Sequence, residues 1–335
     1  MPLLLAPMEG VVDYNMRNLL TSLGGIDRCV TEFLRISDRL LPPKVFYRLC
    51  PELHHDGKTL AGVPVYLQLL GGQGDVMADN AARATELGAP GIDINFGCPA
   101  KTVNRSDGGA ILLREPERVG RIVEAIRQTL PATTPLTVKI RLGYSDTHFF
   151  RDNVQAISNA GANELIIHAR TKQQGYRPPA HWQEIARAQQ WVHIPVIANG
   201  EIWSIEDARN CRQITACETL MLGRGALCRP DLPRLVTADM KNDTIEALGW
   251  RDIPALLFQF FELTLAHYDA HCVGNPIKQW LVYLRCYFPQ AALLFEQIKR
   301  LRKPAELASA LLRVCDETAT DSQITNICQI DKQIA

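Results

Sequence analysis

The sequence predicts an α/β fold: a (β/α)8 TIM barrel over residues 1–240, followed by a small C-terminal helical bundle over residues 241–335. Eight short apolar runs alternate with helix-like stretches over about 230 residues, as a barrel requires. Many of these runs are continuously apolar, which is typical of parallel strands that are covered on both faces. After about residue 240 the strand-like runs stop, and apolar residues recur at helical spacing.

The expected strands cover residues 3–6, 29–33, 63–70, 91–96, 136–141, 164–169, 194–198 and 219–222. Helical patterns such as 75–88, 116–130 and 149–160 separate them. The alternative is an open doubly wound sheet, but no GxGxxG motif follows an early strand. In the last part of the chain, Gly and Pro residues separate four expected helices at 252–271, 274–287, 289–302 and 304–318.

The composition, 47% hydrophobic and 21% charged, fits a soluble globular protein of 335 residues with one large and one smaller domain. Because 36 basic residues balance 36 acidic ones, only a local basic face could bind nucleic acid. The ten cysteines include no CxxC pair, and we find neither a secretion signal nor an apolar run of about 18 residues. We therefore expect reduced thiols in a cytoplasmic protein.

Residues 91–104 (GIDINFGCPAKTVN) are the most informative stretch of the chain. Ile92 and Ile94 lead into Asn95-Phe96-Gly97-Cys98-Pro99, which predicts a buried strand that ends in a tight loop presenting a thiol. Barrel enzymes place their chemistry just past the carboxyl ends of the strands. Cys98 is therefore the candidate catalytic residue, and the alternative is an inert buried cysteine.

Polar residues also mark the ends of the earlier strands. The first strand runs into Pro7-Met8-Glu9-Gly10, which could also be an ordinary turn. Gln68 stands near the end of the third strand, where a buried amide needs partners from a structural network or from a planar heterocycle. Lys139 in the fifth strand is costly to bury without a charged partner, so it either pairs with a neighbouring strand or faces an anionic ligand.

The later strands end in residues suited to a phosphate. Asn199-Gly200-Glu201 follows the seventh strand and Gly223-Arg224 follows the eighth, where barrels often bind a phosphate through backbone N–H groups. Arg224 could add a charge-assisted bond. His168, in the sixth strand, has no second His or Cys at metal spacing, so we expect no metal site. Together with Lys139, these turns predict a phosphate-bearing cofactor.

As a set, the strand-end motifs resemble those of the tRNA-dihydrouridine synthases, a family of flavin-dependent barrel enzymes. The matching pieces are LAPMEGVVD (5–13), TEF (31–33), QLLGG (68–72), DINFGCPAKTVN (93–104), GGA (108–110), VKIRLG (138–143), HARTKQQGY (168–176), VIANGEI (196–202) and GRGAL (223–227). Residues 35–53 and 276–285 most resemble the bacterial branch that modifies position 16 of the tRNA D-loop.

The resemblance implies FMN as the prosthetic group and NADPH as the reductant. It implies that Pro7 and Met8 contact the flavin through their backbone, with Glu9 beside them, and that Gln68 bonds the isoalloxazine edge. Lys139 would lie near the N1/O2 side of the flavin, and His168 would touch the flavin or its phosphate. The phosphate and ribityl tail would be held by Asn199, Gly200, Glu201, Gly223 and Arg224, and the target uridine would face Asn95 and Tyr176.

The implied reaction transfers a hydride from reduced FMN to C6 of uracil and a proton to C5. Cys98 is the implied general acid, since a thiol with a pKa of about 8.5 is mostly protonated at neutral pH. The other nine cysteines are expected to be structural.

A uracil in folded tRNA must be unstacked to reach a barrel mouth, so a second surface has to hold the tRNA body. We expect the helical domain to supply it, from residues Lys278, Tyr283, Arg285, Lys299, Arg300, Arg302 and Lys303, joined by Arg35 and Arg39 after the second strand. A monomer is expected because tRNA needs access to both domains.

Two other functions compete with this interpretation. An FMN barrel enzyme that acts on a free pyrimidine, as dihydroorotate dehydrogenases do, would leave the helical domain without a role. A tRNA-binding protein without catalysis, acting as an RNA chaperone, would not need Cys98 or Lys139.

Overall fold

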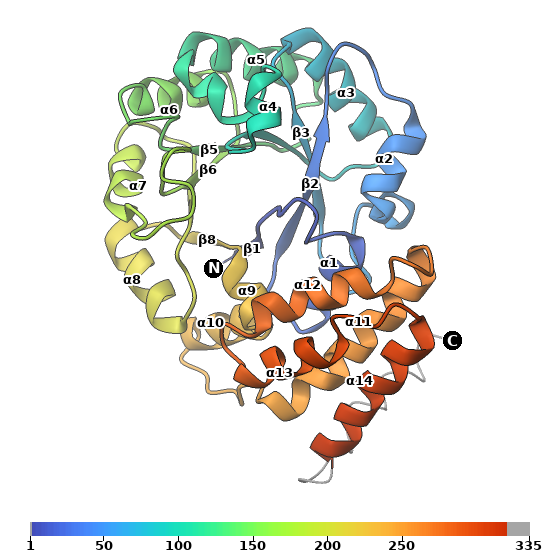
Figure 1. The fold of residues 1–335 in the computed structure, drawn as a ribbon. Coiled ribbons are helices and arrows are strands. Elements are labelled where there is room, and N and C mark those ends of the chain that lie inside the picture. The colour runs from blue at the N-terminus through green and yellow to red at the C-terminus, as the bar shows by residue number, and fades with distance from the viewer. Residues whose placement is uncertain (1, 320–335) are drawn as a thin grey trace. The chain divides into compact units, whose positions relative to one another are not determined.

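The first unit of the chain is a closed barrel of eight parallel strands in sequential order (Figure 1). The structure is a computed structural model that describes residues 2–319, and the chain divides into two units, 1–244 and 245–335. The barrel closes where β1 pairs with β8, with Leu3 opposite Leu220 and Leu5 opposite Leu222. The strands are β1 (Leu3–Leu5), β2 (Arg28–Arg35), β3 (Val65–Leu70), β4 (Ile92–Phe96), β5 (Leu136–Arg141), β6 (Glu164–His168), β7 (Val196–Asn199) and β8 (Thr219–Leu222).

Helices form a ring outside the strands (Figure 1). Local sequence explains several of their starts: Asp13 accepts a hydrogen bond from the N–H of Met16 at 2.9 Å, and Ser204 accepts one from the N–H of Asp207 at 3.0 Å. The helices of this unit are α1 (Tyr14–Ser22), α2 (Pro43–Leu49), η1 (Pro51–His55), α3 (Gly74–Glu86), α4 (Lys101–Arg105), η2 (Gly109–Arg114), α5 (Pro116–Thr129), α6 (Phe150–Asn159), α7 (Trp182–Gln189), α8 (Ile205–Thr215), α9 (Arg224–Cys228) and α10 (Leu232–Met240).

The predicted barrel is confirmed, with each of the eight expected strands in place. Two strands differ most from expectation: β7, expected over residues 194–198, covers Val196–Asn199, and β2, expected over residues 29–33, continues to Arg35. A register shift between Val30 and Phe33 lets the strand continue its pairing with β3 as far as Arg35 opposite Leu70. Arg35 is charged, so a strand signal read from apolar residues did not extend to it.

The interior of the barrel is apolar in its middle. Leu4, Ala6, Val30, Tyr66, Ile166, Ile197 and Met221 form one buried cluster contributed by six strands and the residue after β1. Side chains of a strand alternate between its two faces, so these residues alternate with others that pack against the helices. Because apolar side chains fill the middle of the barrel, the polar side chains of the site lie at the carboxyl ends of the strands.

The second unit is helical, as predicted. It contains η3 (Trp250–Asp252), α11 (Ile253–His267), α12 (Gly274–Leu284), α13 (Pro289–Ile298) and α14 (Pro304–Ala319). Phe260 and Trp280 pack edge to face with ring centroids 5.4 Å apart, and Leu281 and Leu307 are fully buried. Helices α11, α12 and α13 end three or four residues earlier than expected. The turns that follow them also contain apolar residues, so the helical pattern in the sequence runs past the true helix ends.

The nine cysteines among residues 2–319 form no disulfide, and Cys328 lies outside the described residues. No described helix has both the length and the apolar character needed to cross a bilayer.

We predict that Glu52→Ala strongly destabilises the barrel unit. Arg17 and Glu52 are both fully buried, and Arg17 donates to both carboxylate oxygens, at 2.7 and 2.9 Å. Removing one partner leaves a buried charge unpaired, which typically costs about 3–5 kcal/mol. Urea unfolding measures the loss. Glu117→Ala, at an exposed ion pair 3.7 Å long, is the control and should cost less than about 0.5 kcal/mol. Equal effects of the two substitutions would contradict the prediction.

Candidate active site

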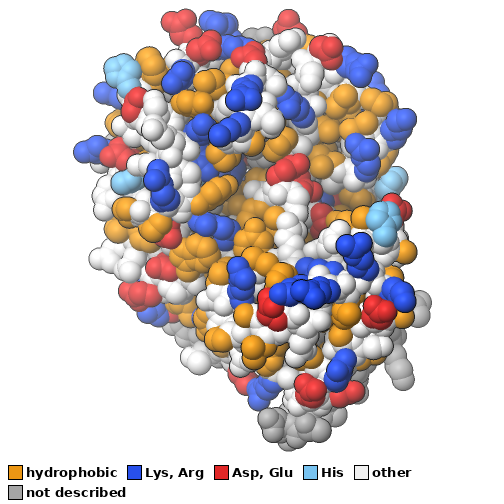
Figure 2. Space-filling view, viewed as in Figure 1, with side chains coloured by type: hydrophobic (Ala, Val, Ile, Leu, Met, Phe, Trp, Pro, Cys, Tyr) orange, Lys and Arg blue, Asp and Glu red, His pale blue; other side chains and the backbone are white. Residues whose placement is uncertain are grey.

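The carboxyl ends of the barrel strands carry the predicted site residues. Figure 2 shows that this face is hollowed near its centre, with Lys and Arg side chains beside the hollow. Pro7 and Met8, after β1, are half-buried, whereas Glu9 is exposed. Partial burial and the neighbouring Glu32 raise the pKa of Glu9 to about 6.

Cys98 lies in a loop after β4 that is held from several directions. The N–H groups of Gly97 and Cys98 both donate to Asn95 Oδ1, at 2.9 and 2.8 Å. The Cys98 carbonyl accepts from Asn104 Nδ2 at 2.9 Å, and Arg141 Nε donates to the Gly97 carbonyl at 2.8 Å. These bonds give the half-buried thiol a defined position at the barrel mouth.

The thiol of Cys98 is neutral at neutral pH. Burial raises its pKa above the ordinary value of a thiol, and Glu9 acts in the same direction. A backbone N–H from Ala100 and the charges of Arg141 and Arg35 oppose this shift but do not cancel it. A protonated thiol can donate a proton, whereas an activated thiolate would act as a nucleophile.

Gly109 allows the chain to approach this loop closely. Its φ is +70°, and a Cβ there would lie 3.0 Å from the Cys98 carbonyl oxygen and 3.1 Å from Cys98 Cβ. Any side chain at this position would push on the loop that carries the thiol.

Gln68 belongs to a chain of buried hydrogen bonds below the Cys98 loop. Its Nε2 donates to Asp93 Oδ2 at 2.6 Å, and its Oε1 accepts from Asn95 Nδ2 at 2.8 Å. Asp93 also accepts from Thr137 Oγ1. Gln68 and Asp93 are fully buried, and Asn95 is nearly so. The structural network that the sequence left open for Gln68 is therefore present, and Asn95 organises the loop.

Lys139 finds a polar partner on another strand. Its Nζ donates to Asn199 Oδ1 at 3.0 Å, and Asn199 Nδ2 donates to the Met221 carbonyl at 2.8 Å. Burial and the charge of Arg141 lower the pKa of Lys139, while the nearby Asp93 opposes the shift. Lys139 and Asn199 thus link β5, β7 and β8 at the mouth.

His168 and Arg170 place hydrogen-bonding groups at the end of β6. Burial, followed by the charges of Arg141 and Lys139, lowers the pKa of His168 well below its ordinary value, so the imidazole is neutral. His168 Nδ1 and Arg170 Nη1 are buried without a hydrogen-bond partner. Gly200, with φ +118°, lets the imidazole approach, since a Cβ there would lie 3.3 Å from His168 Nε2.

Glu201 does not offer its carboxylate to the mouth. It forms an ion pair with Arg170 and accepts a hydrogen bond from Trp203 Nε1 at 2.8 Å. Burial, with Arg224 and Arg141, lowers the pKa of Arg170 to about 10. The Glu201 carboxylate would repel a phosphate, so we expect that Glu201 could contact one only through its backbone.

Arg224 is stacked between two aromatic rings. Its guanidinium carbon lies 4.7 Å from the centre of the Tyr176 ring and 4.8 Å from that of Trp203. Arg141 lies 5.2 Å from the same Tyr176 ring, which is 52% exposed. Tyr176 is thus an exposed aromatic surface fixed by two cations.

These side chains fit an anionic, hydrogen-bonding cofactor such as FMN. Two orphaned buried nitrogens, on His168 and Arg170, need a partner. Lys139, Arg141 and Arg224 have no carboxylate within ion-pair distance among the described residues. Cations gathered in a partly buried space favour a phosphate or an anionic ring. No group of three or more potential metal ligands occurs within residues 2–319.

Four functional candidates were missed by sequence reasoning: Asp93, Arg141, Arg170 and Trp203. Asp93 lies inside the run IDINF, and its inward position follows from strand alternation. Arg141 and Arg170 follow Lys139 and His168 at a spacing of two, which was a usable signal for the same face of a strand. Trp203 has no such signal.

The predicted RNA contacts are spread over both units. Arg35 is exposed at the end of β2, and Arg285 is exposed at the end of α12. Tyr283 is half-buried. Lys278 Nζ donates to the Leu301 carbonyl at 2.6 Å, and Lys299 pairs with Glu296. Lys278 and Lys299 therefore make contacts within the helical unit, whereas Arg285 is exposed.

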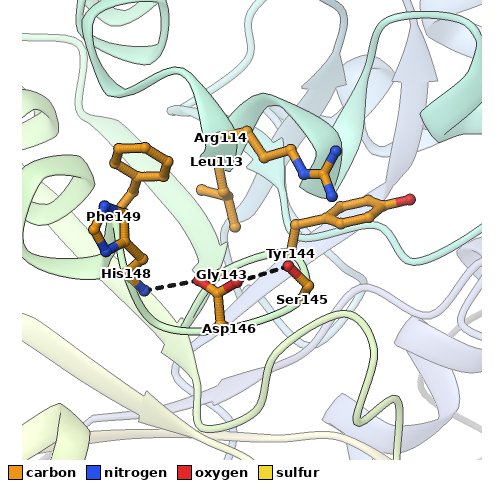
Figure 3. A pocket seen from close by; sticks show the side chains of 8 residues that line it. All are labelled: Leu113, Arg114, Gly143, Tyr144, Ser145, Asp146, His148 and Phe149. Atoms are coloured by element: carbon orange, nitrogen blue, oxygen red, sulfur yellow. Dashed lines mark hydrogen bonds between the residues drawn. The ribbon is translucent and has the colours of Figure 1, made fainter.

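A separate pocket of about 240 Å³ lies on the barrel unit, where η2 meets the loop between β5 and α6 (Figure 3). None of the predicted cofactor residues lines it. Its walls are formed by Leu113, Arg114, Gly143, Tyr144, Ser145, Asp146, His148 and Phe149.

Comparison with known sequences assigns the chain to a family. The family model described as dihydrouridine synthase (Dus) matches residues 4–321. A protein of Pseudomonas syringae pv. tomato named tRNA-dihydrouridine(16) synthase is 48% identical over 300 residues, which are 90% of this chain and 95% of that protein. Proteins of the same name from Shewanella oneidensis and Yersinia pestis are 47% and 44% identical, covering 93% and 94% of this chain and 97% and 99% of their own.

Solved structures share the barrel. An old yellow enzyme homologue from Zymomonas mobilis superposes with a TM-score of 0.50 at 14% identity, covering 73% of this chain and 90% of that one. Histamine dehydrogenase from Rhizobium sp. 4-9 gives a TM-score of 0.54 at 14% identity, covering 78% of this chain and 48% of that one. At this identity the likeness concerns the fold alone.

We predict that Cys98 is alkylated slowly at neutral pH, although its thiol is only half-buried and therefore partly accessible to a reagent. Its raised pKa keeps the thiolate fraction small, so the rate rises with pH through and above the ordinary thiol range. Iodoacetamide labelling followed by peptide mass spectrometry measures the rate, with the exposed Cys286 as the internal reference. Cys98 labelling several-fold faster than Cys286 at pH 7 would mean an activated thiolate and contradict the assignment as a proton donor.

Proposed function

The chain belongs to the dihydrouridine synthase family, and we propose that it reduces the C5–C6 double bond of uridine 16 in the tRNA D-loop to 5,6-dihydrouridine. The position is supported by relatives named tRNA-dihydrouridine(16) synthase that match at least nine-tenths of the chain. The single observation that carries the reaction is the neutral Cys98 thiol, held in a defined loop beside the cation-rich mouth of a barrel.

The strand ends hold the cofactor in this proposal. Lys139, His168 and Gln68 bind the ring system, and the turns at Asn199-Gly200 and Gly223-Arg224 bind the phosphate and ribityl tail. Pro7, Met8 and Glu9 line the same site through their backbone, and the Glu201 side chain orients Arg170. Bound FMN, reduced by NADPH, supplies the hydride that adds to C6 of the uracil.

Cys98 completes the reduction. Its S–H bond breaks as the proton passes to C5 of the uracil, and the resulting thiolate is reprotonated from solvent. The raised pKa suits this task, because the group must stay protonated until the hydride has been transferred. Asn95 accepts hydrogen bonds from the amides of Gly97 and Cys98 and so fixes the conformation of the Cys98 loop. Tyr176 provides a ring against which the flipped uracil can stack.

The helical unit holds the tRNA body in this proposal. Arg285, with Tyr283 two residues before it, is the leading contact, since Lys278 and Lys299 already bind within the unit. The enzyme acts as a monomer in the cytoplasm, where both units remain open to the tRNA.

The defining experiment incubates the protein with FMN, NADPH and tRNA from a strain that lacks all dihydrouridine synthases, and then maps dihydrouridine by position. Product at position 16 alone is expected. Product at another D-loop position would overturn the position but keep the reaction. Turnover of free uridine or dihydroorotate, without any product in tRNA, would overturn the proposed substrate.

We predict that Cys98→Ala keeps FMN bound and reducible by NADPH but lowers dihydrouridine formation by about 10²-fold or more, since general acid catalysis contributes about that much. Single-turnover reaction with tRNA measures the product, and stopped-flow absorbance follows reduction of the flavin. Cys272→Ala, at another half-buried cysteine, is the control and should be unchanged. Full product yield in Cys98→Ala would remove Cys98 from the mechanism.

A further inference from the structure

The pocket between η2 and the β5–α6 loop has an unusual arrangement of charge. Arg114 ends η2 and lines the pocket, whereas Lys172 lies after β6 and is not part of the lining. Both lie against the ring of Tyr144, at 4.4 and 4.6 Å from its centre. Lys172 Nζ also donates to the Tyr144 hydroxyl at 3.3 Å. Figure 3 shows the Arg114 guanidinium over this ring and Phe149 on the other side of the opening.

Neither cation has a carboxylate within 4 Å in the part of the chain that the structure describes. On the outer helices the pattern differs, since Arg187 pairs with Glu184 and Arg209 with Asp239. The pocket wall also holds Asp146, whose pKa is lowered by hydrogen bonds from His148 and Ser145 and more weakly by the charge of Arg114, but Asp146 forms no ion pair with either cation. The Tyr144 ring compensates the two positive charges only in part. Such a place favours a polyanion.

The pocket belongs to the catalytic end of the barrel. Gly143 in its wall is two residues beyond Arg141, which donates to the Gly97 carbonyl in the Cys98 loop. The N–H of Ala110, in η2, donates to the Cys98 carbonyl at 3.2 Å. Other exposed cations without an ion pair among residues 2–319 follow the strands at this end: Arg35, Lys101, Arg105 and Arg177.

We propose that Arg114, Tyr144 and Lys172 bind the RNA strand that flanks the target nucleotide, with one neighbouring base lying against Phe149 in the pocket. The inference rests on the proposed function, because flipping a uridine requires its neighbours to be held. Two cations suit phosphates, and the 38% exposed Phe149 ring suits a base. Asp146, which already accepts bonds from Ser145 and His148, suits amino groups of a base rather than a phosphate.

Salt-dependent tRNA binding tests this surface. Arg114→Gln with Lys172→Gln should weaken binding about fivefold or more and reduce the slope of log K against log salt by about 1.4–1.8, as expected for two lost phosphates. Arg187→Gln with Arg209→Gln removes the same charge from the outer helices and should leave both quantities nearly unchanged. Arg285→Glu, in the same assay, measures how much the helical unit contributes to tRNA binding. Equal effects of the two glutamine pairs would overturn the proposal.

A second variant leaves every charge in place. Phe149→Ala should weaken tRNA binding about fivefold or more without changing the salt slope, because it removes only a stacking surface. Ile214→Ala, an equally exposed apolar residue on α8, is the matched control. Unchanged affinity in Phe149→Ala would exclude the base from the pocket. Wild-type protein that neither binds tRNA nor forms dihydrouridine would overturn the proposed function itself, whereas a working wild type with unaffected variants would overturn only this surface.

A different observation carries a second inference, about Asp93. An ionised carboxylate can only accept hydrogen bonds, so Asp93 fixes which end of the Gln68 amide faces it. Gln68 Oε1 must then face Asn95, and Asn95 Oδ1 must face the amides of Gly97 and Cys98. Each of these bonds joins a donor to an acceptor only if Asp93 accepts from Gln68.

The structure assigns Asp93 as a positioning residue that sets the Cys98 loop through Gln68 and Asn95. Asp93 itself is fully buried and does not reach the mouth. Its charged neighbours are Lys139 on β5 and Arg28 on β2, which both favour the ionised form, while burial raises its pKa to about 6.

Labelling of Cys98 in the protein without tRNA tests this role. Asp93→Asn should speed iodoacetamide labelling of Cys98 at least about threefold and slow dihydrouridine formation, with flavin content retained. Wild-type product formation should fall below about pH 6, as Asp93 gains a proton, and Asp93→Asn should lack that limb. Asp231→Asn, at another fully buried carboxylate, should affect neither readout. Unchanged labelling and an unchanged acidic limb in a folded Asp93→Asn protein would overturn the assignment.

Discussion

Closure of the parallel barrel between β1 and β8 is the constraint on which the rest of the structure depends. All eight strands run the same way, so their eight carboxyl ends meet at one end of the barrel. The apolar cluster around Leu4, Ile166 and Met221 fills the interior below. Polar side chains above it are brought together from distant parts of the chain, as the bond between Lys139 and Asn199, 60 residues apart, illustrates.

The balance of charge at this end follows from burial. Asp93 and Glu201 neutralise only part of the positive charge of Lys139, Arg141, Arg170 and Arg224. Burial, together with the remaining excess of positive charge, lowers the pKa of His168 and leaves its imidazole neutral. The Cys98 thiol also stays neutral, because burial outweighs the cations around it. A space of this kind favours an anionic ring and phosphate beside an uncharged proton donor.

Particular residues show how far sequence reasoning reached. Cys98, Gln68, Lys139 and His168 could be named as candidates because each stands at or near the end of a recognisable strand, and a strand end is a local pattern. Asp93 was missed, since its partners Gln68 and Thr137 lie 25 and 44 residues away and only strand pairing brings them together. Lys278 was named for its charge alone, and the bond of its ammonium to the carbonyl of Leu301, 23 residues further along, could not be predicted from the sequence.

The sequence by itself determined the barrel, the helical unit that follows it, and the identity of the groups at the strand ends. Apolar periodicity and turn residues are properties of short segments, so they can be recognised without the tertiary structure. Only the tertiary structure decided which of these groups touch. It showed that Glu201 faces Arg170, that Arg224 lies between Tyr176 and Trp203, and that Arg114 and Lys172 meet on Tyr144. Such contacts depend on strand register and loop approach, and these arise from packing of the whole chain rather than from any one segment.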